Sequence, residues 1–105
     1  MVTEADVTRL IEVIATHVEA KKIILFGRYV QNTMRSDSDI DILVLVDDSI
    51  SNLRESVQLL YRKVHAVVGI PCDILVEHES TFQERSALPT IERTIVREGK
   101  VIYTA

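Results

Sequence analysis

One segment constrains the fold more than any other, and it is the apolar run Ile40–Val46, which directly follows Asp39 and contains Asp41. Apart from Asp41 the run is continuously apolar, which predicts a strand that is covered on both faces. Carboxylates are out of place in such a strand, because an unpaired buried carboxylate costs several kcal/mol. Asp39 and Asp41 therefore need either solvent or a positive charge beside them.

The segment before this run predicts a helix followed by a short strand. Apolar residues recur there at helical spacing, with Thr3 placed to act as the N-cap. We expect Lys21 and Lys22 at the negative C-terminal end of this helix. The next apolar residues, Ile23–Phe26, predict a strand that ends at Gly27.

The segment after the run alternates between the two kinds of element again. A second helix is expected from a cap at Ser51 to Gly69, and a third strand is expected at Cys72–Val76. The remaining elements are a helix that starts near Pro89 and ends at Gly99, and an edge strand at Val101–Tyr103. With no repeat and no linker between these pieces, residues 1–105 are predicted to form one domain of the α/β or α+β class.

The amino-acid composition excludes some classes of protein but does not identify the function. Hydrophobic residues make up 47% of the 105, enough for a real core, so a disordered chain is excluded. The net charge of −4 disfavours a protein that coats long nucleic acid, which would need a basic surface. Cys72 is the only cysteine, and no apolar run approaches the length of a membrane helix, so we expect a soluble, cytoplasmic protein.

The aspartates themselves suggest a site for metal ions. Asp39 and Asp41 are two residues apart in an extended chain, so they share a face with their Cα atoms about 6.6 Å apart. Asp73 joins them if its strand pairs beside the second one. Mg²⁺ prefers such oxygen ligands, and two Mg²⁺ ions roughly 3.5–4 Å apart suit phosphoryl or nucleotidyl transfer. The alternative is that these carboxylates simply face water at a strand entrance, and spacing leaves both interpretations open.

Two other carboxylate motifs fit poorly. A calcium loop of the EF-hand type that started at Asp37 would need glycine at its sixth position and usually glutamate at its twelfth, where this chain has Ile42 and Asp48. A phosphatase with an aspartate nucleophile would carry its aspartate pair at the exit of an apolar strand, whereas here the apolar run follows the pair.

The chain resembles the minimal nucleotidyltransferases of the DNA polymerase beta superfamily in one stretch. This stretch consists of Leu25–Arg28, ten further residues, and then Asp39-Ile40-Asp41 followed by an apolar strand. Their signature is Gly-Ser, ten residues, and Asp-x-Asp before an apolar strand. This resemblance implies a mixed β-sheet flanked by helices. It also implies that Asp39, Asp41 and Asp73 hold two Mg²⁺ ions, with Asp73 either a metal ligand or the base for an acceptor hydroxyl.

The resemblance further implies a reaction and a partner. Gly27, Arg28 and Arg35 would bind the phosphates of a nucleoside triphosphate, for which we expect ATP. AMP would pass to a hydroxyl of a partner protein. Similar small family members are antitoxins whose partner is a HEPN-domain protein that can be adenylylated on tyrosine. Neither long nucleic acid nor a membrane is expected as a partner, and homo-oligomerisation stays open.

The chain departs from the family signature where phosphate is bound. Arg28 stands in the place of the signature serine, and Asn32 stands where relatives usually have a second glycine. Arg28 either pairs with a γ phosphate or fills the nucleotide pocket and pairs with Asp39 or Asp41 in place of metal. In the second case the chain is a catalytically impaired binding module that neutralises a HEPN-type partner by contact. Both interpretations remain open at the level of sequence.

Overall fold

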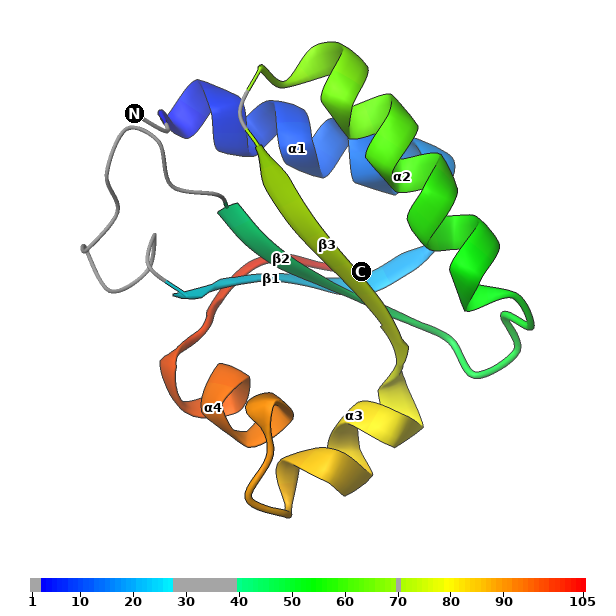
Figure 1. Cartoon of the computed structure of the whole chain (residues 1–105), viewed down its shortest axis with the longest axis vertical. Coiled ribbons are helices and arrows are strands. Elements are labelled where there is room, and N and C mark those ends of the chain that lie inside the picture. The colour runs from blue at the N-terminus through cyan, green and yellow to red at the C-terminus, as the bar shows by residue number, and fades with distance from the viewer. Residues whose placement is uncertain (1–2, 28–39, 70) are drawn as a thin grey trace.

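The fold is built on a four-stranded mixed sheet, as the resemblance implies (Figure 1). A computed structural model of the chain describes residues 3–27, 40–69 and 71–105. The sheet has the order β3-β2-β1-β4, with β2 parallel to β3 and antiparallel to β1, and β1 antiparallel to β4. Its strands are β1 at Ala20–Phe26, β2 at Ile40–Val46, β3 at Cys72–His78 and β4 at Lys100–Thr104.

Helices cover both faces of the sheet (Figure 1). The long helices α1 at Glu4–His17 and α2 at Leu53–Val67 pack against each other on one face. The short helices α3 at Glu79–Ser86 and α4 at Ile91–Glu98 lie on the other face. β2 therefore lies between two layers of helices and two neighbouring strands. None of the helices in the described part of the chain is both long and apolar enough to cross a membrane.

The side chains of β2 alternate between two hydrophobic clusters. Ile40, Ile42, Val44 and Val46 point into the larger cluster with α1 and α2, whereas Leu43 and Leu45 point into the smaller cluster with α3 and α4. Such alternation is the period of an extended strand, and here both faces are apolar because both are covered. The predicted strand Ile40–Val46 is confirmed, and Asp41 falls on the side of α3 and α4.

Two sequence-based expectations about element ends were wrong. Lys21 and Lys22 do not end the first helix but lie in β1, which begins at Ala20 because pairing with β2 extends that far. The second helix is capped by Asn52 rather than Ser51, since the Asn52 side chain accepts the N–H of Glu55 at 3.0 Å. Each error reflects a local signal overridden by strand pairing or by the next residue along the chain.

The helix expected to start near Pro89 and to end at Gly99 is confirmed as α4. Its N-cap is Thr90, whose hydroxyl accepts the N–H of Arg93 at 3.3 Å. The cap at Thr3 is confirmed, with its hydroxyl accepting the N–H of Asp6. The edge strand expected at Val101–Tyr103 is also confirmed within β4.

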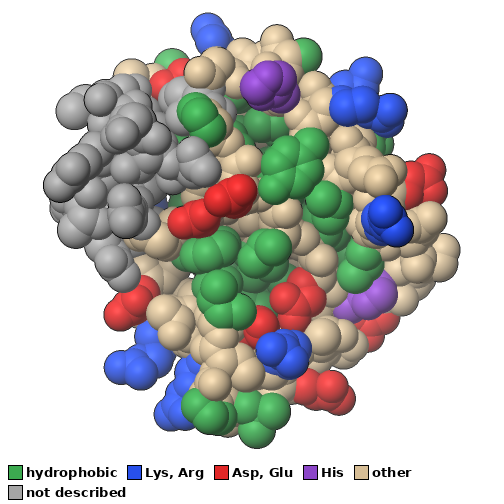
Figure 2. Space-filling view, in the orientation of Figure 1, with side chains coloured by type: hydrophobic (Ala, Val, Ile, Leu, Met, Phe, Trp, Pro, Cys, Tyr) green, Lys and Arg blue, Asp and Glu red, His purple; other side chains and the backbone are tan. Residues whose placement is uncertain are grey.

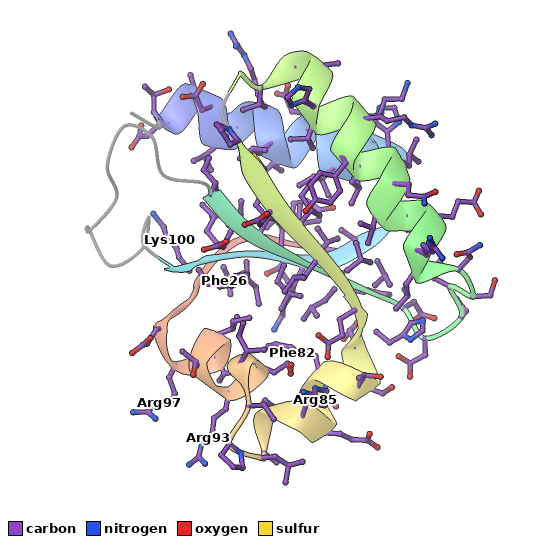
Figure 3. The ribbon with its side chains drawn as sticks, viewed as in Figure 1. Phe26, Phe82, Arg85, Arg93, Arg97 and Lys100 are labelled. Carbon is purple, nitrogen blue, oxygen red and sulfur yellow. The ribbon has the colours of Figure 1, made fainter. Side chains whose placement is uncertain are left out.

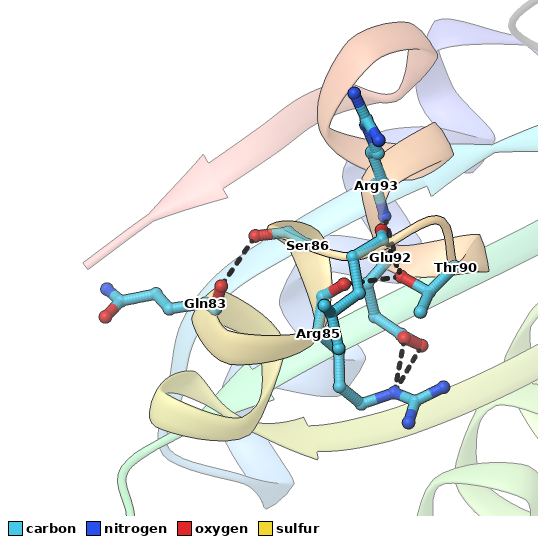
Figure 4. A network of polar contacts seen from close by, with 7 residues as sticks. Gln83, Arg85, Ser86, Thr90, Glu92 and Arg93 are labelled. Atoms are coloured by element: carbon cyan, nitrogen blue, oxygen red, sulfur yellow. Dashed lines mark hydrogen bonds and ion pairs between the residues drawn. The ribbon is translucent and has the colours of Figure 1, made fainter.

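α3 has no counterpart in the sequence-based expectations, because its residues are mostly polar and show little helical periodicity. An ion pair joins it to α4 (Figure 4). Nε of Arg85 donates to both carboxylate oxygens of Glu92, at 3.0 and 2.7 Å. The hydroxyl of Thr90 also donates to the carbonyl of Arg85 at 2.6 Å. These contacts fix the two short helices as one unit under the sheet.

Packing in the larger cluster stabilises the fold, and a substitution at Ile14 tests this contribution to the free energy of unfolding. Ile14 of α1 is fully buried, so Ile14→Ala should lower the free energy of unfolding by about 2–5 kcal/mol through lost burial and the cavity left behind. Ile91→Ala is the matched control, because Ile91 is 52% exposed, and should change it by less than about 0.5 kcal/mol. Urea unfolding followed by circular dichroism measures both. Equal effects would contradict the core as described.

Candidate functional site

The register of the sheet brings two of the predicted carboxylates together. Asp41 of β2 lies directly opposite Asp73 of β3 and directly opposite Phe26 of β1. Residues paired in this way point to the same face, on strands about 4.8 Å apart. Asp41 and Asp73 are thus side by side on the face that carries α3 and α4, where Figure 3 also shows Phe26.

Gly27 lies directly against the side chain of Asp41. It has a φ of 76°, in the left-handed region that favours glycine. A Cβ atom at this position would collide with the Oδ2 atom of Asp41, so the carboxylate packs directly on the backbone of the turn. The glycine of the signature therefore has two structural reasons in this chain: a backbone conformation and space for a carboxylate.

The first residue of β2 is also held by a backbone hydrogen bond to the segment before β3. The N–H of Ile40 donates to the carbonyl of Pro71 at 2.9 Å, which ties the start of β2 to the segment that leads into β3. Asp41 is half-buried, whereas Asp73 is exposed. The pair therefore offers one oriented carboxylate and one that is open to a ligand.

The donor chemistry of this pair fits Mg²⁺, which takes oxygen ligands and is commonly held by one or two carboxylates together with substrate phosphates. Two neighbouring carboxylates also repel each other unless a positive charge lies near them. Within residues 3–27, 40–69 and 71–105, no group of three histidine, cysteine, aspartate or glutamate side chains is arranged to hold a metal ion. The third predicted ligand, Asp39, lies outside those residues.

The predicted site residues divide into two sets. The structure brings Gly27, Asp41 and Asp73 together, although they come from three separate points in the chain. The others lie outside the described residues, namely Arg28, Asn32, Arg35 and Asp39. Their roles remain predictions.

Sequence reasoning missed a second polar group on the same face. Glu77 follows Asp73 by four residues on β3, so both side chains are on the side of α3 and α4. Oε1 of Glu77 is buried and has no hydrogen-bond partner among the residues that the structure describes. Burial raises the pKa of Glu77, and the nearby Glu92 carboxylate raises it further, while Arg85 opposes the shift. Alternation along β3 was a usable signal for Glu77, but its charged neighbours Arg85 and Glu92 come from α3 and α4, and the sequence did not reveal α3.

The sequence matches the family described as "Polymerase beta, Nucleotidyltransferase" over residues 8–105. The chain belongs to this nucleotidyltransferase family. A relative found by sequence comparison is a Methanocaldococcus jannaschii protein, MJ0604, whose name describes it as a putative protein adenylyltransferase. It is 34% identical over 86 residues, which cover 79% of this chain and 78% of the relative.

Solved structures with the nucleotidyltransferase fold agree with the family assignment. A toxin–antitoxin structure with AMP-PNP superposes with a TM-score of 0.68 at 26% identity, over 99% of this chain and 75% of the other. A point mutant of the toxin–antitoxin MntA-HpeT gives a TM-score of 0.65 at 26% identity, over 100% and 75%. A Shewanella oneidensis complex of tri-AMPylated HEPN toxin with MNT antitoxin, at 19% identity and a TM-score of 0.63 over 97% and 72%, shares the fold.

The close packing of Asp41 on Gly27 predicts a position-specific glycine requirement. Gly27→Ala should destabilise the chain by about 1–2 kcal/mol, because alanine is strained at this φ, and should displace the Asp41 carboxylate. Gly69→Ala is the control, since nothing described lies within 4 Å of a Cβ atom there. Urea unfolding and the amide chemical shifts of Asp41 and Asp73 measure both effects. Similar shifts in the two variants would contradict the contact.

The raised pKa of Glu77 predicts a pH-dependent stability. Because the folded chain binds this proton more tightly than the unfolded chain, the resulting stabilisation is complete below the ordinary value of 4.5 and is lost as pH rises through the raised pKa. Glu77→Gln should therefore raise the melting temperature at neutral pH and not at acidic pH. Glu84→Gln, on the exposed face of α3, should leave the profile unchanged. A lower melting temperature for Glu77→Gln at neutral pH would refute the assignment.

Proposed function

We propose that this chain is a nucleotidyltransferase that uses Mg²⁺ to move AMP from ATP to a hydroxyl group of a partner protein. The observation that carries the proposal is the register pair of Asp41 and Asp73 beside the Gly27 turn, in a chain that belongs to the nucleotidyltransferase family. A solvated strand entrance alone would not require a glycine beneath one carboxylate.

Each side chain has a proposed role. Asp41 and Asp73, with Asp39, would hold two Mg²⁺ ions, which would supply positive charge to neutralise the phosphates. The backbone of the Gly27 turn, with Arg28 and Arg35, would bind the β and γ phosphates. Asp73, which is exposed, would accept the proton of the acceptor hydroxyl or act as a metal ligand.

The reaction is a balanced group transfer. The acceptor oxygen forms a bond to the α phosphorus, the bond from that phosphorus to the bridging oxygen breaks, and pyrophosphate leaves. The hydroxyl proton passes to Asp73 or to water. The products are a phosphodiester between AMP and the acceptor, and free pyrophosphate.

The partner is proposed from the relatives together with the fold. A similar protein is named as a putative protein adenylyltransferase, and similar structures are toxin–antitoxin complexes, one of them with AMP-PNP. We therefore propose that residues 1–105 form one nucleotidyltransferase domain that acts as the antitoxin of a HEPN-domain protein. Pull-down of the tagged chain from its host, followed by intact-mass analysis, should show a helical partner that carries an AMP adduct on tyrosine.

A second candidate function rests on the arginine at the signature serine position. Arg28 would fill the nucleotide pocket, and the chain would then neutralise its partner by contact alone. Arg28→Ser separates the two proposals when the partner is co-expressed. Adduct formation with the wild-type chain excludes the contact-only function, whereas an adduct that appears only with Arg28→Ser supports it.

The role of Asp73 makes a binding prediction. Asp73→Asn should weaken the binding of ATP in the presence of Mg²⁺ by roughly tenfold or more, because one negative charge is removed from the metal ligands. Glu84→Gln, which removes an exposed charge from α3, should bind as the wild type does. Isothermal titration calorimetry measures both. Absence of heat with wild-type chain, Mg²⁺ and ATP would overturn the proposed function.

A further inference from the structure

The carboxylate pair has an apolar border on the sheet. Next to the row of Asp73, Asp41 and Phe26 lies the row of Leu75, Leu43 and Ile24, which share the same face. Figure 2, in which β3 is toward the viewer, shows hydrophobic side chains gathered beside acidic ones at the centre of the view. We call Ile24, Leu43 and Leu75 the apolar border.

Its members differ in how far the helices cover them. Leu43 is fully buried and Ile24 is 5% exposed, because both pack in the cluster that contains Phe82 of α3 and Ile95 of α4. Leu75 is 42% exposed, although it stands in the same row as Leu43. The short helices thus leave open the part of the face that adjoins Asp73.

The chemistry of the apolar border limits which groups can bind beside Asp73. None of the three side chains of the apolar border offers a hydrogen bond, so a group flanked by several hydroxyls, such as a sugar, would lose hydrogen bonds to water and gain none. A side chain with an apolar body and one terminal hydroxyl loses little, because its body packs on Leu75 while its oxygen reaches the carboxylates. The exposed leucine is two residues from the exposed aspartate on one strand, about 6.6 Å along it.

We propose that Leu75 seats the acceptor side chain of the protein substrate beside Asp73 and is a specificity-determining residue for the transfer. This inference rests on the proposed function and deepens it, since it assigns residues to the second substrate. The nucleotide is bound from the Gly27 side of the carboxylates and the acceptor from the Leu75 side. The occupant is an aromatic hydroxyl side chain of the partner.

The test uses a small phenol as the probe, so that binding is measured apart from catalysis. N-acetyl-L-tyrosinamide is titrated into the ¹⁵N-labelled full chain, with and without Mg²⁺ and ATP. Amide shifts should centre on Asp73 and Leu75, and N-acetyl-L-serinamide should cause none there. Shifts that are equal for the two probes would overturn the inference.

Variants at the two edges of the sheet provide the matched comparison. Leu75→Ser should weaken binding of the phenol roughly fivefold, through lost apolar contact, while Leu75→Met should restore it. Val101→Ser is the control, because Val101 is paired with Ile24 at the opposite edge of the same sheet and is similarly exposed at 50%. Equal loss in Leu75→Ser and Val101→Ser would overturn the inference.

The same experiment separates the inference from the proposed function. Displacement of the phenol by ATP with Mg²⁺ would overturn the inference, because the apolar border would then hold the base. If ATP binds with Mg²⁺ but the phenol shifts no amide near Leu75, the inference fails and the proposed function stands. If the phenol binds as described while ATP causes no heat, the acceptor seat stands and the proposed function fails.

Discussion

The register of β2 between its two neighbours is the constraint on which the site depends. β2 is buried on both faces, so a shift of one residue would exchange its side chains between the two clusters and turn Asp41 toward the larger one. That register places Asp41 across from Asp73 on one side and Phe26 on the other, and sets the Asp41 carboxylate on the backbone of Gly27. The core of the protein thus determines where its functional carboxylates lie.

Much of this arrangement could be predicted from the sequence. The continuous apolar run after Asp39 predicts a doubly covered strand, and the position of Asp73 at the head of a later strand predicts a shared face once the two strands are neighbours. The family resemblance supplied that neighbour relation. Periodicity alone could not, because strand order depends on long-range contacts rather than on local pattern.

The features that escaped prediction depend on tertiary contacts. α3 is polar along most of its length and is held by Phe82 and by the pair of Arg85 and Glu92, none of which forms a local pattern. Glu77 has a raised pKa only because α3 and α4 bury it beside Glu92. Leu75 is exposed on β3, which is an edge strand of the sheet, and this too depends on strand order rather than on local pattern.

The central claim is that the carboxylates beside Gly27 hold the metal that accompanies the nucleotide. Mn²⁺ takes the same oxygen ligands as Mg²⁺ and is paramagnetic, so it broadens amide signals close to it. In the presence of ATP, the account predicts that substoichiometric Mn²⁺ broadens Gly27, Asp41 and Asp73 first, and Glu77 and Glu92 later. Broadening centred on Glu77 and Glu92, or spread evenly over the exposed carboxylates, would contradict it.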